Sequence, residues 1–222
     1  MNYLLLFLAV VAGYIVALIL RKKDLKNMEV FMAFSGAFLL SITVFELLPK
    51  VFESPSKSIG VYIMLGILLQ IFLEFFSKGA EHGHVHLHSE NKHFPWILFI
   101  SLSIHAFMEG FPISEENNLL VAIIIHKIPV AIILSFFFIT AGYKQSTTLF
   151  FLFFFGVMTP LGNFISNHYE FVHQYETQIT AVVIGIFLHV STTILFESSK
   201  NHKFHPAKMA AVIVAIGMAY LL

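Results

Sequence analysis

Apolar residues fill the chain in long runs separated by short polar stretches, and this pattern recurs from one end to the other. A run of about 20 apolar residues in a helix is long enough to cross roughly 30 Å of hydrocarbon. We therefore predict an all-α integral membrane protein, an eight-helix transmembrane bundle. The eight spans are expected near residues 3–20, 29–49, 59–77, 95–113, 119–139, 147–167, 178–198 and 206–222.

The composition supports a membrane protein, because 58% of the residues are hydrophobic and only 12% are charged. Soluble domains carry roughly 25% charged residues. The formal net charge is zero, so neither end offers a basic arm for nucleic acid, and we expect a lipid bilayer as the surroundings. The chain has no cysteine, so any metal site must use histidine, carboxylate or neutral oxygen.

The connections between the predicted spans are short, apart from a polar loop at residues 78–94. We therefore expect a single transmembrane domain over residues 1–222. Basic residues stay on the cytoplasmic side of a membrane, which makes the 78–94 loop cytoplasmic and both termini extracytoplasmic in a multi-pass protein of the plasma (inner) membrane. Ten basic residues lie on the loop's side, against Lys50 and Lys57 on the other: Arg21, Lys22, Lys23, Lys26, Lys78, Lys92, Lys144, Lys200, Lys203 and Lys208.

The second and seventh predicted spans resemble each other, with a Gly-x-Phe-Leu start and a Phe-Glu end in residues 36–46 and 185–197. An offset of five spans pairs helices 1–3 with helices 6–8 in opposite orientation. Many transporters use such an inverted repeat, which here leaves helices 4 and 5 as a central pair. We expect the polar chemistry on that pair.

Three residues of the central pair suit a metal ion. His105 and Glu109 are spaced i and i+4, so they project from one face of the fourth helix, and His126 lies on the fifth. Counted from the 114–118 loop, His105 and His126 lie at similar depth, roughly 10–12 Å into the membrane. Two imidazoles and one carboxylate suit Zn²⁺ and also hold other divalent ions.

Each of these residues alone has a simpler interpretation, in which the histidines pack and form hydrogen bonds and Glu109 reaches water. An ionised carboxylate inside a membrane is costly, however, so Glu109 needs a partner. Pro129, three residues after His126, frees the carbonyl of Ile125 beside the predicted site.

Several motifs resemble those of the ZIP family of zinc and iron transporters. HAFMEG at residues 105–110 and HKIP at 126–129 are similar to the paired metal-binding motifs of that family. Supporting similarities are FELLPK at 45–50, TPLGNFIS at 159–166 and GIFLHVSTTILFES at 185–198, in the family's order along the chain. The resemblance implies a helical bundle that carries divalent cations toward the cytoplasm, along a path beside helices 4 and 5. It also implies that His105, Glu109 and His126 form the transport site.

The departures from the family pattern point to a single-metal site. Family members often have polar or acidic residues where this chain has Ala106, Lys127 and Val130, and those residues often build a second metal site. Lys127 either pairs with Glu109 or faces elsewhere in the bundle. Glu46 is a secondary candidate for the transport path, because the family often places a polar or charged residue at its position. In the alternative interpretation, Glu46 and Glu74 lie near helix ends and their carboxylates reach the membrane interface.

The cytoplasmic loop carries alternating histidines, a pattern that binds zinc weakly. The candidate loop ligands are therefore His82, His84, His86, His88 and His93, unless the loop is a linker without function.

Zn²⁺ is the expected substrate; Fe²⁺, Mn²⁺ or Cd²⁺ also fit such ligands. The alternative functions are an intramembrane metal-dependent hydrolase, for which no His-Glu-x-x-His helix is present, and a non-transporting scaffold. The chain is not expected to be an enzyme, and a homodimer stays an open alternative.

Overall fold

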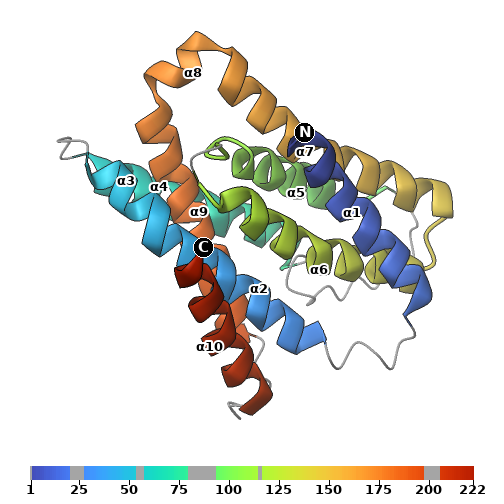
Figure 1. Ribbon diagram of the computed structural model, residues 1–222. Coiled ribbons are helices and arrows are strands. Elements are labelled where there is room, and N and C mark those ends of the chain that lie inside the picture. Colours follow the sequence, from blue (N-terminus) through green and yellow to red (C-terminus); the bar gives the residue numbers. More distant parts are fainter. Residues whose placement is uncertain (1, 21–27, 54–57, 80–93, 115–116, 198–205) are drawn as a thin grey trace.

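The computed structural model describes residues 2–20, 28–53, 58–79, 94–114, 117–197 and 206–222, and within these ranges all regular structure is helical. The helices form one bundle (Figure 1). Their bounds are α1 Asn2–Ile19, α2 Met28–Ile42, η2 Thr43–Leu47, α3 Leu48–Phe52, α4 Ile59–Ser77, α5 Trp96–Glu109, α6 Leu119–Thr140, α7 Gln145–His168, α8 Glu170–Gln174, α9 Glu176–Glu197 and α10 Pro206–Leu221.

All eight predicted spans coincide with helical segments, and most helix ends fall within a few residues of the predicted ones. Five helical stretches are long and apolar enough to cross a membrane: 28–52, 59–77, 119–140, 145–168 and 176–196. Three shorter apolar helices, 3–19, 96–109 and 206–221, complete the set among the described residues. The protein is therefore a helical multi-pass membrane protein, and the count of eight spans stays a prediction.

The helices pack in two groups. In one, α1 packs against α6 and α7, and α5 packs against α7; in the other, α4 packs against α9, and α2 against α9 and α10. Figure 1 shows α10 lying alongside α2, and α8 at the turn between α7 and α9. The groups meet where α2 contacts α6 and where α4 contacts α5. The central helices α5 and α6 thus belong to one group and are covered by helices of the other.

The second predicted span is a continuous helical rod with a widened turn in it. A π-helical turn at Thr43–Leu47 connects α2 to α3. Pro49 lies two residues after this turn. A proline ring in a helix clashes with the carbonyl four residues earlier, here that of Phe45. The wider π turn relieves this conflict. Glu46 lies inside this π turn.

The fourth span is shorter than predicted, because α5 ends at Glu109 and not near residue 113. Gly110 caps the helix and Pro112 follows two residues later, a combination that stops helices. The carbonyls near this end bind side chains of α7. Thr159 Oγ1 donates to the Ala106 carbonyl at 2.6 Å, and Asn163 Nδ2 donates to that of Ile113 at 2.8 Å. Irregular backbone inside a membrane needs partners of this kind.

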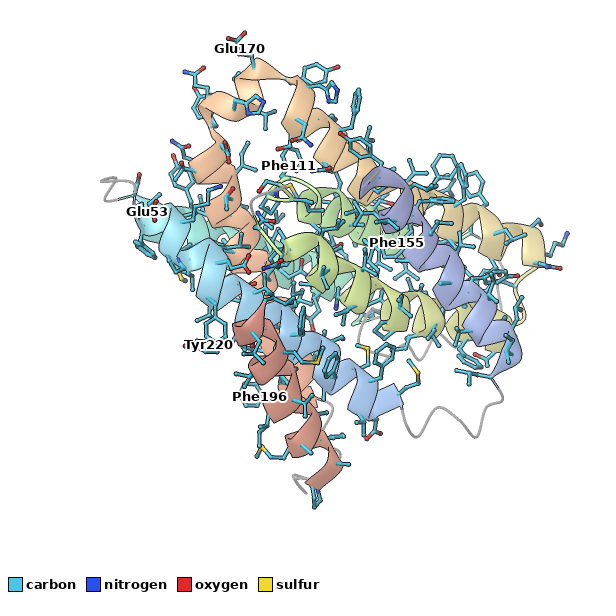
Figure 2. The ribbon with its side chains drawn as sticks, in the orientation of Figure 1. Glu53, Phe111, Phe155, Glu170, Phe196 and Tyr220 are labelled. Atoms are coloured by element: carbon cyan, nitrogen blue, oxygen red, sulfur yellow. The ribbon has the colours of Figure 1, made fainter. Side chains whose placement is uncertain are left out.

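The outward face of the bundle is apolar. Phe196 and Tyr220 are each 77% exposed and extend from the outer surface of α9 and α10, whereas Phe155 lies between helices (Figure 2). Exposed Phe, Leu and Ile side chains also cover α4. An apolar exterior of this size suits contact with lipid hydrocarbon.

Candidate metal site

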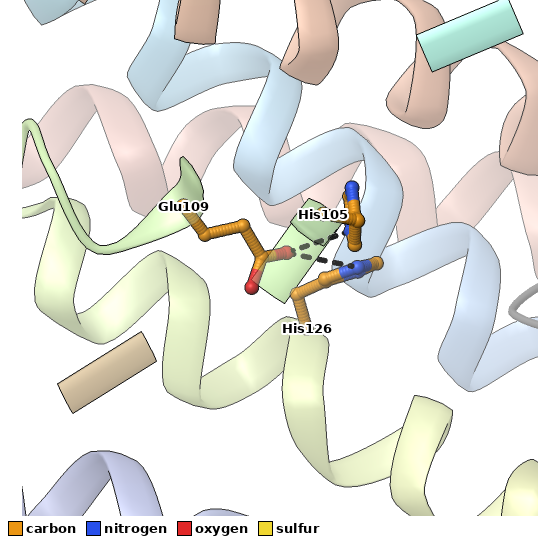
Figure 3. A group of neighbouring side chains, drawn as sticks. All are labelled: His105, Glu109 and His126. Carbon is orange, nitrogen blue, oxygen red and sulfur yellow. Dashed lines mark ion pairs between the residues drawn. The ribbon is translucent and has the colours of Figure 1, made fainter. Parts of the chain in front are cut away.

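The structure brings the three predicted metal ligands together. One ligand atom from each of His105, Glu109 and His126 lies within 4.8 Å of the other two. Figure 3 shows both imidazoles directed at the same carboxylate oxygen, Oε1 of Glu109. Nε2 of His105 lies 3.0 Å from that oxygen, and Nε2 of His126 lies 3.8 Å from it. The i and i+4 spacing on α5 thus places its two residues on one face, with His126 of α6 opposite.

The spacing of these atoms suits a tetrahedral metal ion. Bonds of about 2.0–2.2 Å to nitrogen and oxygen place neighbouring ligand atoms roughly 3.3 Å apart in a tetrahedron. The observed separations of 3.0 and 3.8 Å lie on either side of that value. The three residues are at most 3% exposed, so the site is closed to solvent. Three protein ligands leave a fourth position for water, as in zinc sites that exchange ligands.

Lys127 faces Glu109, which resolves the two orientations that the sequence left open. Its Nζ lies 2.8 Å from Oε2 of Glu109, and both residues are 1% exposed. The same Nζ lies 4.5 Å from the ring centroid of Phe155, a cation–π arrangement. Glu109 thus directs one oxygen at the two imidazoles and the other at an ammonium. The ammonium offsets much of the cost of burying a carboxylate.

A close helix crossing fixes the position of Glu109. A Cβ atom on Gly110 would lie 2.2 Å from the carbonyl oxygen of Thr159, and one on Gly162 would lie 2.1 Å from that of Phe107. Neither position has room for a side chain, so glycine allows α5 and α7 to approach at the backbone. The glycines of HAFMEG and TPLGNFIS therefore both allow the same close backbone contact.

Gln70 is a polar contact of the site that the sequence gave no reason to single out. It is 0% exposed on α4, and its Oε1 lies 3.0 Å from Nδ1 of His105. The two residues are 35 positions apart, and a lone glutamine in an apolar helix forms no motif. Only its depth in the membrane, where an uncharged polar group still needs a partner, could have drawn attention to it.

Glu46 lies apart from the three-residue cluster. Its two carboxylate oxygens accept hydrogen bonds from the backbone N–H and the Nδ2 of Asn118, at 2.8 and 2.9 Å. Asn118 precedes the first residue of α6, where unpaired N–H groups favour a carboxylate. Glu46 therefore ties the η2 turn to the start of the helix that carries His126. Its predicted place on a transport path stays a prediction.

The remaining predicted residues lie away from this site or outside the described ranges. Glu74 was expected to reach the membrane interface, yet its Oε2 lies 2.5 Å from Nε2 of His189 on α9. His82, His84, His86, His88 and His93 lie outside the described residues, so their proposed metal binding stays a prediction.

Two known proteins are similar in sequence to part of this chain. It is 24% identical to protein zntD of Dictyostelium discoideum over 164 residues, which are 64% of this chain and 24% of that protein. It is 29% identical to zinc transporter ZIP1 of Danio rerio over 89 residues, which are 37% of this chain and 30% of that protein. The matches thus span less than a third of either relative.

A profile of the ZIP zinc transporter family matches residues 78–222, well over half of the chain. The matched part includes α5, α6, α7 and α9 and with them the buried His105, Glu109 and His126. The match agrees with the resemblance that the HAFMEG and HKIP motifs indicated. The chain belongs to the ZIP zinc transporter family.

Proposed function

We propose that this protein transports divalent metal ions, with zinc as the main substrate, across a membrane toward the cytoplasm. The observation that carries the proposal is the meeting of His105, Glu109 and His126 at one buried point between apolar helices. Membership in the ZIP zinc transporter family supports the same function. The matched family is one of zinc transporters, and zinc transporter ZIP1 of Danio rerio is similar to part of the chain, which favours zinc over Fe²⁺, Mn²⁺ or Cd²⁺.

The ligand set supports a dication and not a monovalent ion. Oε1 of Glu109 is a hard anionic donor, and two imidazoles are donors of intermediate softness that zinc accepts readily. Divalent ions gain more from one carboxylate than Na⁺ or K⁺ do, because the Coulomb energy scales with the charge. The absence of cysteine in the chain leaves nitrogen and oxygen as the available ligands.

The site is proposed to hold one metal ion at a time. Oε2 of Glu109 already faces the Lys127 ammonium at 2.8 Å. A second dication beside that oxygen would meet the ammonium at close range, in a site with no further carboxylate among the described cluster. Ala106 and Val130, which stand at family metal-ligand positions, add no donor. Glu109 therefore gives one oxygen to the metal and one to Lys127.

Transport requires a change of conformation, because the ligands are closed to solvent on all sides in this structure. The distribution of basic residues predicts a cytoplasmic 78–94 loop. The proposed direction of transport, toward the cytoplasm, rests on what the ZIP family resemblance implies. The packing is compatible with an inverted repeat of helices 1–3 and 6–8, because α4 packs on α9 just as α10 packs on α2. Under this proposal residues 1–222 form one transporter domain of eight spans in the plasma (inner) membrane, with both termini extracytoplasmic.

The proposed function is tested by metal uptake into proteoliposomes that contain purified protein. His105→Ala, Glu109→Gln and His126→Ala are each expected to abolish zinc uptake, since each removes one of three ligands. His168→Ala is the matched control, because His168 is an exposed histidine whose Nδ1 contacts the Phe164 carbonyl. Wild-type uptake by a well-folded Glu109→Gln protein would refute the site. Turnover of lipid or peptide without metal uptake would favour the hydrolase alternative.

A further inference from the structure

Gln70 is a fully buried amide in the middle of the largely apolar helix α4. Its neighbours along α4 are Leu68, Leu69, Ile71 and Phe72, and several of these face outward. Burying an amide without a hydrogen-bonding partner is costly, so its position calls for a specific contact. The contact is made with a proposed metal ligand, since Oε1 of Gln70 lies 3.0 Å from Nδ1 of His105.

This contact favours one tautomer of His105, because its partner is the amide oxygen of Gln70. A carbonyl oxygen only accepts hydrogen bonds, so the imidazole must donate from Nδ1. In the neutral ring, Nε2 then carries a lone pair and no proton. That lone pair faces Oε1 of Glu109, another acceptor, at 3.0 Å. Two acceptors that face each other at this distance need a cation between or beside them.

The contact also fixes the plane of the ring. His105 is held at one nitrogen by α4 and directs the other nitrogen toward α6, where Nε2 of His126 approaches the same oxygen. Metal-binding histidines in proteins usually donate their second N–H to an oxygen that orients the ring and sets its tautomer. Gln70 provides that oxygen from the other packing group of helices.

We propose that Gln70 is a positioning residue that holds His105 in the Nδ1–H tautomer, with Nε2 ready to bind the metal. The inference rests on the proposed metal site, and it adds α4 to the helices that build that site. A side chain of this kind does not contact the metal itself. Its removal is expected to weaken metal binding by about 10- to 100-fold, the usual effect of losing such a partner.

Two substitutions separate this role from simple packing. Gln70→Met keeps the length and volume of the side chain but loses the acceptor, so a positioning role predicts weaker zinc binding, seen as a higher half-saturating concentration. Gln70→Glu keeps an acceptor oxygen, so it is expected to retain most of the affinity. A packing role predicts the reverse, because methionine suits an apolar helix and a buried carboxylate does not. Gln145→Met is the control, since Gln145 is an exposed glutamine on α7.

The tautomer itself is measured in metal-free protein by ¹⁵N NMR of histidine-labelled samples, with the His105 signals assigned from a His105→Ala sample. The wild type is expected to keep a proton on Nδ1, whether or not Nε2 also holds a proton toward Glu109, and Gln70→Met is expected to lose this preference for Nδ1. This readout needs neither transport nor metal, so it stands apart from any failure of the proposed function. A wild-type His105 protonated at Nε2 alone would overturn the inference, even if Gln70→Met does not fold. Unchanged zinc affinity in a folded Gln70→Met protein would overturn it as well.

Discussion

Replacing Lys127 with methionine removes a buried charge while it keeps most of the side chain's length. Nζ of Lys127 lies 2.8 Å from Oε2 of Glu109, and at an effective dielectric constant of about 20 such unit charges attract by about 6 kcal/mol. Breaking a buried pair by removing one partner costs about 3–5 kcal/mol, because the other charge remains buried. The metal-free Lys127→Met protein is therefore expected to lose about 3–5 kcal/mol of stability.

Zinc should reverse this loss. A dication bound to Oε1 of Glu109 would lie roughly 5 Å from Nζ of Lys127, where the ammonium repels it by about 7 kcal/mol at the same dielectric constant. Methionine removes that repulsion, although structural relaxation recovers part of the energy. We expect the half-saturating zinc concentration to fall at least about tenfold, which corresponds to about 1.4 kcal/mol. Tighter binding should also slow zinc release and lower the maximal uptake rate.

The assay combines thermal unfolding of the purified protein over a zinc titration with uptake into proteoliposomes. A ligand that binds the folded state raises the unfolding temperature with its concentration, so the variant should be less stable without zinc and gain more from it. Lys208→Met is the control, because Lys208 pairs with the 42% exposed Glu29 at 2.8 Å, far from the three ligands in the sequence and on other helices. Because Glu29 reaches solvent, this pair is expected to contribute less than the fully buried pair of Lys127 and Glu109. A Lys127→Met protein with the zinc response of the wild type would refute this reasoning.

Three further predictions follow from the same contacts. Lys127→Asp combined with Ala106→Asn should raise the core stoichiometry from one metal to two, measured by elemental analysis of loop-deleted protein; two tightly bound core ions in the wild type would contradict it. Gly162→Ala should destabilise the protein by about 1–3 kcal/mol in a denaturation experiment, because its Cβ would lie 2.1 Å from the Phe107 carbonyl oxygen; unchanged stability and uptake would argue against the close crossing. Deleting residues 82–93 should preserve basal zinc uptake, since the proposed transport site lies elsewhere, and complete loss of uptake in correctly inserted protein would show that the loop is essential.

The apolar pattern was sufficient to predict most of the helices, because a bilayer requires long apolar segments whatever the details of packing. The pairing of His105 with Glu109 followed from helix periodicity, and the depth argument placed His126 near them. The family resemblance of the ordered motifs is confirmed by the match over residues 78–222. Each of these inferences depends on the spacing of residues within a single helix or motif.

The features that escaped prediction depend on contacts between distant segments. Gln70 and His105 are 35 residues apart, and the sequence does not encode which turn of α4 faces α5. The sequence left open whether Lys127 pairs with Glu109 or faces elsewhere in the bundle, because the spacing along α6 does not say which helix lies beside that face. The early end of α5 is matched by hydrogen bonds from Thr159 and Asn163 of α7 to the carbonyls of Ala106, in the last turn, and Ile113, beyond the helix.

The central claim is that His105, Glu109 and His126 together hold the transported metal. The most direct measurement is an anomalous difference map at the zinc edge from zinc-soaked crystals of the full chain. One strong peak is predicted about 2.0–2.2 Å from Nε2 of both histidines and from Oε1 of Glu109. Zinc peaks confined to other residues, with none at this cluster in a zinc-saturated crystal, would contradict the account.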